Sequence, residues 1–127
     1  MKFLHTMIRV TDLEQSIEFY TKVLGMTVLS RTENRDYRYT LVFVGYANQA
    51  DATSIELTYN WDTQEYDLGN AFGHLALGID NIYSACDNIK ALGGKVTREP
   101  GPVKGGSTLI AFITDPDGYQ IELIQTN

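Results

Sequence analysis

Two short stretches, FLHTMIRV at residues 3–10 and FGHLALGI at residues 72–79, decide how this chain is built. Each begins with a phenylalanine and has a histidine two positions later, so that His5 recurs 69 positions on as His74. Farther along, the triplet Ile-Glu-Leu around Glu56 recurs 66 positions later around Glu122. A repeat of this length predicts two copies of one structural unit, and a loop can absorb the three-residue difference between the offsets.

Each copy predicts one strand, one helix and three further strands. The first helix is expected to begin after Asp12, a good N-cap with Gln15 three residues later, and to end before Gly25. The turn DPDG at residues 115–118 predicts a hairpin between the last two strands. The expected strands are 3–10, 26–31, 38–46, 53–60, 73–79, 95–98, 107–114 and 119–125, and the second helix is expected over 81–92.

The resulting fold class is α+β, with two βαβββ modules in a single domain over residues 1–127. Module 1 covers about 1–60, a polar linker about 61–71, and module 2 about 72–127. A module of about 60 residues buries one sheet face poorly by itself. The two sheets are therefore expected to pair face to face, within one chain or between chains.

Composition narrows the classes of function. The net charge of −6 argues against nucleic-acid partners and against an anionic membrane surface. No stretch approaches the about 18 apolar residues of a spanning helix, and the first residues do not resemble a signal peptide. The chain has one cysteine, Cys86, so it can form no intramolecular disulfide, and a cytoplasmic location is expected. Cys86 itself is expected in the core, on the apolar face of the second helix.

Four residues at matched repeat positions carry the chemistry: His5 and Glu56 in one copy, His74 and Glu122 in the other. Each histidine is expected in the first strand of its module and each glutamate in the last. Two imidazoles and two carboxylates form a nitrogen and oxygen ligand set for a divalent metal, with coordination positions left for substrate. A structural histidine and a solvated glutamate are the alternative for each residue taken singly, and the twofold recurrence favours the metal site.

Two polar residues should share the face of these ligands, because side chains four apart on a strand point the same way. Arg9 follows His5 by four residues, and Asn60 follows Glu56 by four. An Arg fork suits a carboxylate, and an Asn amide suits a peptide-like group, although an ordinary salt bridge and a strand-end turn are equally open. Gly78 stands where module 1 has Arg9 and is expected to leave space there.

The Gly- and Pro-rich segment 98–106 predicts a mobile loop. Its cations, Arg98 and Lys104, suit closure over an anionic ligand, and a plain surface loop is the alternative. Tyr59 and Trp61, near the end of a strand, either line a pocket or pack in the core.

These residues together resemble the glyoxalase I family, the lactoylglutathione lyases, and its short bacterial form in particular. The family lies in the vicinal oxygen chelate superfamily, whose unit is a βαβββ module and whose paired mixed sheets form a cupped barrel. The resemblance extends over essentially the whole chain. It rests on the segments HTMIRV at 5–10, DL at 12–13, SI at 16–17, FYTKVLGM at 19–26, ELTYNW at 56–61, GH at 73–74, DPDGY at 115–119 and IE at 121–122.

The resemblance implies that His5, Glu56, His74 and Glu122 bind one metal, nickel by preference, with cobalt or zinc as alternatives. The site then lies between modules of two chains, which implies a homodimer with two sites. The implied reaction isomerises the hemithioacetal of methylglyoxal and glutathione, through an enediolate, to S-lactoylglutathione. It detoxifies methylglyoxal, and glutathione is the cosubstrate. Glu122 is the candidate base, and Glu56 is a catalytic residue for the other stereochemical face.

The resemblance also implies a substrate-binding set: Arg9, Asn60, His74, Lys104 and Gly105. Arg9 and Asn60 would contact the glutathione moiety, and Lys104 and Gly105 would lie in the loop that covers it. Asn70 departs from the family, because some members carry an arginine there for the substrate carboxylate.

Two other classes of function remain. The first is another metal enzyme of this superfamily, either an epimerase or a ring-cleaving dioxygenase. The dioxygenase uses two histidines and one carboxylate for iron, whereas this chain offers Glu56 as a fourth ligand. The second is a non-enzymatic protein that sequesters a ligand, which would lack the metal-binding set.

Overall fold

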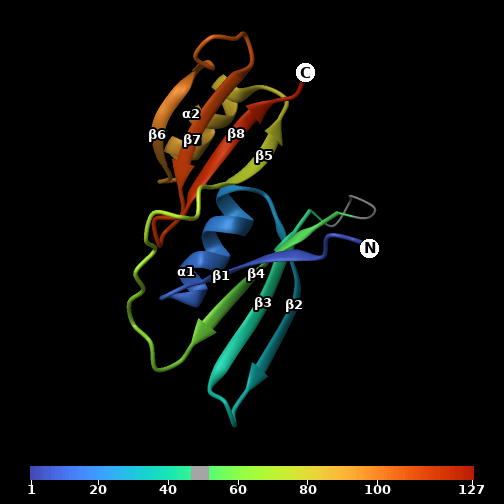
Figure 1. Cartoon of the computed structure of the whole chain (residues 1–127), viewed down its shortest axis with the longest axis vertical. Coiled ribbons are helices and arrows are strands. Elements are labelled where there is room, and N and C mark those ends of the chain that lie inside the picture. Colours follow the sequence, from blue (N-terminus) through green and yellow to red (C-terminus); the bar gives the residue numbers. More distant parts are fainter. Residues whose placement is uncertain (47–51) are drawn as a thin grey trace. The chain divides into compact units, whose positions relative to one another are not determined.

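The computed structural model describes residues 1–46 and 52–127. The chain divides into two compact units, Met1–Asp67 and Leu68–Asn127, and each contains one helical segment and four strands (Figure 1). The division falls within the predicted linker, and the element order in each unit is βαβββ. The structure therefore confirms two copies of one module.

Unit 1 is a mixed sheet with one helical segment. Its strands lie in the order β1-β4-β3-β2, with β1 parallel to β4 and the other pairs antiparallel. The register of β1 and β4 sets Met7 opposite Glu56 and Arg9 opposite Thr58. The elements are β1 (His5–Arg9), α1 (Leu13–Glu18), η1 (Phe19–Val23), β2 (Thr27–Asn34), β3 (Tyr39–Gly45) and β4 (Ser54–Asn60).

Unit 2 repeats this topology. Its strands lie in the order β5-β8-β7-β6, and β5 is parallel to β8 with Ala76 opposite Glu122. His74 precedes β5 by one residue, so it does not lie in the strand as expected. The elements are β5 (Leu75–Ile79), α2 (Ile82–Ala91), β6 (Lys95–Pro102), β7 (Leu109–Thr114) and β8 (Gln120–Gln125).

The core of each unit lies between its helix and one face of its sheet. The Asp12 carboxylate accepts a hydrogen bond from the backbone N–H of Gln15 at 3.1 Å, which confirms the predicted N-cap of α1. In unit 1 the buried positions alternate along β4, so Ile55 and Leu57 face the helix and Glu56 faces the opposite side. In unit 2 Ile121 and Leu123 are buried in the same way. The apolar layer therefore fixes the direction in which each glutamate points.

The first helix differs from the expected α-helix in its second half. The α-helical hydrogen bonding ends at Glu18, and residues Phe19–Val23 form a π-helical turn. Phe19 and Tyr20, adjacent in sequence, are both buried there and pack edge to face, with ring centroids 5.1 Å apart. The wider turn accommodates two consecutive aromatic side chains on the core side.

The predicted hairpin between β7 and β8 is confirmed. Asp115 is buried, and its Oδ1 accepts hydrogen bonds from the backbone N–H groups of Asp117 and Tyr119. Gly118 has φ of 94°, a left-handed conformation that favours glycine. The turn aligns β7 with β8 so that Phe112 lies opposite Glu122.

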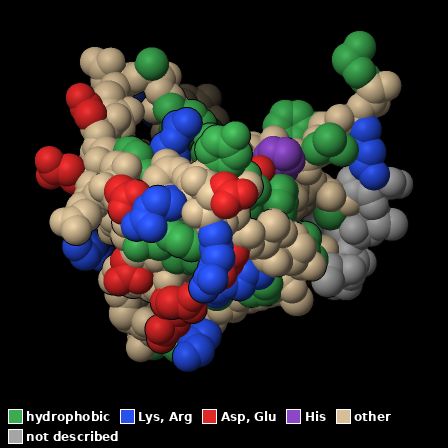
Figure 2. Space-filling model, turned by 90° about the horizontal axis from the view of Figure 1, so that it is seen from below, with side chains coloured by type: hydrophobic (Ala, Val, Ile, Leu, Met, Phe, Trp, Pro, Cys, Tyr) green, Lys and Arg blue, Asp and Glu red, His purple; other side chains and the backbone are tan. Residues whose placement is uncertain are grey.

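None of the helices in the described part of the chain is long and apolar enough to cross a membrane. Figure 2 shows acidic and basic side chains mixed over the face in view, so the negative net charge does not gather in one patch there. The pairing of the two sheets in a cupped barrel stays a prediction.

Candidate metal centre

The first half of the candidate site joins β1 to β4. The parallel register places His5 and Glu56 on the sheet face opposite α1, with His5 Nε2 3.3 Å from Glu56 Oε1. The His5 side chain is 36% exposed and that of Glu56 is 14% exposed. The imidazole is therefore reachable from solvent, and the carboxylate lies deeper beside it.

Two further side chains hold this pair in place. The ring of Phe43, opposite Glu56 on β3, packs edge to face against the His5 imidazole with centroids 5.2 Å apart. Thr58 Oγ1 donates a hydrogen bond to Glu56 Oε2 at 2.7 Å. Both oxygens of the Glu56 carboxylate thus have a polar neighbour.

The second half has the same geometry in unit 2. His74 Nε2 lies 3.1 Å from Glu122 Oε2, and their side chains are 40% and 16% exposed. Phe112, opposite Glu122 on β7, packs edge to face against the imidazole with centroids 5.3 Å apart.

The two phenylalanines beside the histidines were not predicted from the sequence. Phe43 and Phe112 are separated by 69 positions, the offset that relates His5 to His74. That matched spacing was the available signal, but only the sheet register shows that each ring lies beside a histidine.

The donor atoms fit a divalent metal. Two donors bound at about 2.1 Å on adjacent corners of a coordination shell lie about 3 Å apart, close to the 3.3 and 3.1 Å of the two pairs. Imidazole nitrogen and carboxylate oxygen suit borderline ions such as nickel, cobalt and zinc. Among the described residues no group of three or more His, Cys, Asp or Glu side chains is placed to hold a metal. Each unit therefore offers two ligands.

The predicted glutathione contacts lie on the same sheet as the first pair. Arg9 ends β1 and is exposed, and Asn60 ends β4, where its Nδ2 donates a hydrogen bond to the Tyr66 hydroxyl at 2.9 Å. Tyr66 was not predicted from the sequence. In unit 2 a Cβ added at Gly78 would approach Thr126 Cγ2 at 3.1 Å. The expectation of space beside Gly78 is therefore wrong, because Thr126 fills it.

The predicted mobile loop at 98–106 is mostly a strand, which corrects the sequence analysis. β6 continues to Pro102 through two register shifts, and the Arg98 guanidinium donates hydrogen bonds of 2.8–3.1 Å to four backbone carbonyls. Arg98 therefore supports the strand end and has its donors directed at the backbone. The four acceptors are Glu99, Gly101, Pro102 and Ile110.

The remaining turn contains Lys104 and Gly105. Both are exposed, and Gly105 has φ of 81°, a left-handed conformation that favours glycine. A backbone hydrogen bond of 2.8 Å from Val103 to Thr108 closes the turn. Asn70 is exposed in the segment before β5. No contact of these residues with the His74 and Glu122 pair is found among the described residues, so their substrate role stays a prediction.

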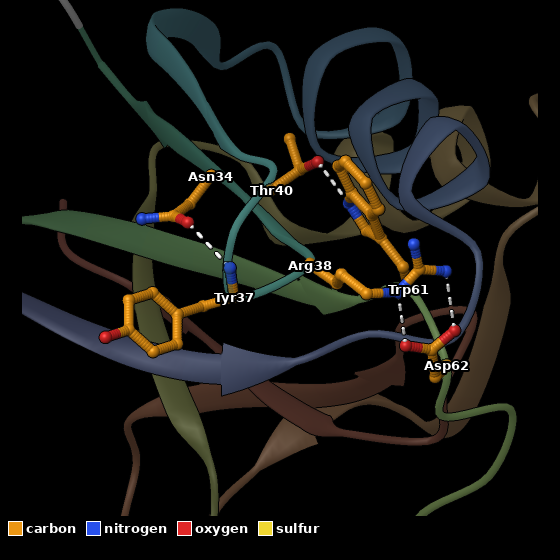
Figure 3. Close-up of polar contacts among 6 residues, drawn as sticks. All are labelled: Asn34, Tyr37, Arg38, Thr40, Trp61 and Asp62. Atoms are coloured by element: carbon orange, nitrogen blue, oxygen red, sulfur yellow. Dashed lines mark hydrogen bonds and ion pairs between the residues drawn. The ribbon is translucent and has the colours of Figure 1, made fainter.

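Tyr59 and Trp61 line a pocket of about 590 Å³ on the helix side of unit 1. Trp61 Nε1 donates a hydrogen bond to Thr40 Oγ1 at 2.9 Å, and the Arg38 guanidinium lies 5.4 Å from its ring centroid (Figure 3). Arg38 also pairs with Asp62 at 2.7 Å, which holds the pKa of the Asp62 carboxyl below its ordinary value. Because Tyr59 and Glu56 lie on opposite faces of β4, this pocket is separate from the metal pair.

Comparison with known families agrees with the fold. Residues 2–123 match the family model described as the glyoxalase/bleomycin resistance protein/dioxygenase superfamily. The chain belongs to the glyoxalase superfamily. Its repeated module is therefore that of a superfamily member.

Several curated relatives of the chain are named lactoylglutathione lyase or probable lactoylglutathione lyase. The chain is 62% identical to the probable lactoylglutathione lyase of Vibrio cholerae, over 98% of this chain and 90% of that one. It is 60% identical to the lactoylglutathione lyase of Salmonella typhimurium, over 98% of this chain and 93% of that one.

Solved structures of superfamily members have the same fold as this chain. Glyoxalase I from Zea mays is 49% identical with a TM-score of 0.93, over 98% of this chain and 44% of the maize chain. The chain thus spans less than half the length of the maize protein. Leishmania major glyoxalase I, described as trypanothione-dependent, is 40% identical with a TM-score of 0.86, over 98% of this chain and 86% of that one.

We predict that replacing Arg98 by Met loosens the end of β6. The substitution removes four hydrogen bonds from a charged donor and leaves their carbonyls to water, which should lower the free energy of unfolding by about 1–3 kcal/mol. Urea denaturation measures the loss, and amide hydrogen exchange should speed up over residues 99–110. Lys95→Met, at an exposed position of the same strand, is the matched control. Equal stability of the two variants would contradict the assigned support.

Proposed function

We propose that this protein is a lactoylglutathione lyase, which converts the hemithioacetal of methylglyoxal and glutathione into S-lactoylglutathione. The observation that carries the proposal is the pair of imidazole and carboxylate groups repeated with the same geometry in both units. The names of relatives about 60% identical over nearly the whole chain support this reaction over an epimerase or a ring-cleaving dioxygenase. A cytoplasmic location stays a prediction.

The metal ligands in this proposal are His5, Glu56, His74 and Glu122. Nickel is the expected ion, with cobalt and zinc as alternatives, and when bound it supplies Lewis-acid stabilisation of negative charge on the two adjacent substrate oxygens. Because the described residues of each unit offer two ligands, the proposed site needs two units. The ligands of one unit then meet those of the other unit in a partner subunit, in a homodimer with two sites.

Proton transfer is the chemical step that the protein performs. The Glu122 carboxylate accepts the proton from the carbon that bears sulfur, and returns it to the neighbouring carbon, so the product is an isomer of the substrate. Glu56 lies on the equivalent strand of the other module and can serve the opposite stereochemical face.

Substrate binding is assigned to residues outside the proton transfer. The Arg9 guanidinium suits a carboxylate of glutathione, and Asn60 suits one of its amides. Lys104 and Gly105, in the exposed turn after β6, cover the same moiety, while His74 lies beside the reacting carbons.

Removal and return of the metal tests the proposed activity. Protein stripped with a chelator should form no thioester from methylglyoxal and glutathione, and nickel should restore formation more fully than zinc. Absorbance of the thioester product measures the rate, with metal content determined in the same samples. Full activity in the stripped protein would contradict the proposal.

Glu122→Gln tests the base. The amide cannot accept the substrate proton, so kcat should fall by about 10²–10⁴-fold while nickel stays bound. Elemental analysis of the purified variant provides the metal content. If nickel-loaded Glu122→Gln had the kcat of the wild type, the assignment of Glu122 as the base would be wrong.

A mixture of two inactive variants tests the sites between subunits. His5→Ala and His74→Ala should each be inactive alone, because every site loses one ligand. A mixed dimer of the two has one site without either histidine and one complete site. Co-expression in equal amounts should therefore restore about a quarter of wild-type activity, since about half of the dimers are mixed. No restoration, with mixed dimers verified by affinity tags, would contradict a site shared between chains.

A further inference from the structure

The internal repeat allows a comparison of the two glutamates within one chain. Glu56 and Glu122 are separated by 66 positions, and the residues two positions after them, Thr58 and Ile124, are separated by the same number. Side chains two apart on a strand share a face, so each neighbour lies on the side of its glutamate. One of these neighbours has a hydroxyl group and the other has only hydrocarbon.

The Glu56 carboxylate is held on both sides, by the Thr58 hydroxyl at one oxygen and by His5 at the other. Thr58 Oγ1 donates to Oε2 at 2.7 Å, while Oε1 lies 3.3 Å from His5 Nε2. Thr58 is only 8% exposed, so water competes poorly for this hydrogen bond. The Glu56 carboxylate therefore cannot rotate without losing one of two contacts.

Glu122 is held on one side only. Its Oε2 lies 3.1 Å from His74 Nε2, and Oε1 has no polar partner among residues 1–46 and 52–127. Since no buried side-chain oxygen in those residues lacks a hydrogen bond, Oε1 reaches solvent. The Glu122 carboxylate thus has one oxygen that no side chain of the described residues holds by a hydrogen bond.

We propose that Thr58 is a positioning residue that would hold the Glu56 carboxylate in place as a metal ligand, and that Ile124, which offers no hydrogen bond, leaves the Glu122 carboxylate available for the substrate proton. This inference rests on the proposed function and adds a structural reason why one glutamate of a symmetric pair is the base. The threonine hydroxyl acts through Glu56 and does not touch the substrate.

Nickel affinity of Thr58 variants tests the first part. Thr58→Val keeps the shape and removes the donor, so nickel binding to the stripped protein should weaken by about 10–100-fold in competition with a chelator. Thr58→Ser keeps the hydroxyl and should restore most of the affinity. Thermal unfolding of both metal-free variants serves as the control for a purely structural effect. Equal nickel affinity in Thr58→Val and wild type would overturn the proposal.

The reciprocal change tests the second part. Ile124→Thr adds a hydroxyl beside Glu122, and it should lower kcat by about tenfold with nickel still bound and KM little changed. Ile124→Val has nearly the same shape without the hydroxyl, so the ratio of kcat between the two variants isolates the hydrogen bond. Equal kcat in both nickel-loaded variants would overturn this part.

The two measurements separate this inference from the proposed function. If the nickel-loaded wild-type protein forms no thioester, the lyase proposal fails. The chelator competition with Thr58→Val and Thr58→Ser still decides whether Thr58 holds Glu56 on the metal.

Discussion

The parallel pairing of the first and last strands in each unit is the constraint on which the candidate site depends. In unit 1 the pairing sets Met7 opposite Glu56, and in unit 2 it sets Ala76 opposite Glu122. A shift of one residue would turn each glutamate toward the helix and bury a carboxylate in the apolar layer. The burial of Ile55, Leu57 and their counterparts in β8 therefore also positions the candidate metal ligands.

The two units have matching candidate ligands, but the residues around those ligands differ. Arg9 faces Thr58 across β1 and β4, whereas Gly78 faces Ile124 across β5 and β8. The duplicated ligands provide an almost symmetric metal set, but a glutathione adduct has different groups at its two ends. Different neighbours around the shared geometry would let the two units contact different parts of the adduct, as the proposed function requires.

The sequence predicted what depends on periodicity and repetition. Alternating apolar residues located the strands, Asp12 located a helix start, and the repeat located His5, Glu56 and their equivalents. Contacts that depend on how the strands pair in space could not be predicted in this way. The edge-to-face contact of Phe43 with His5 depends on the register between β3 and β4. The hydrogen bonds by which Arg98 supports β6 depend on register shifts in that strand, and no local sequence pattern predicts those shifts. Glycine and proline at 100–102 suggested a loop because either residue ordinarily weakens a strand.

The buried cysteine affects how the protein withstands methylglyoxal, one of the two compounds that combine to form its proposed substrate. Methylglyoxal is an electrophile, and a thiolate is the form of cysteine that attacks electrophiles. Cys86, on the buried face of α2, is 1% exposed, and burial raises the pKa of its thiol. The sulfur is therefore both shielded and protonated, so the chain carries no reactive thiol of its own that the aldehyde can modify while glutathione is being consumed.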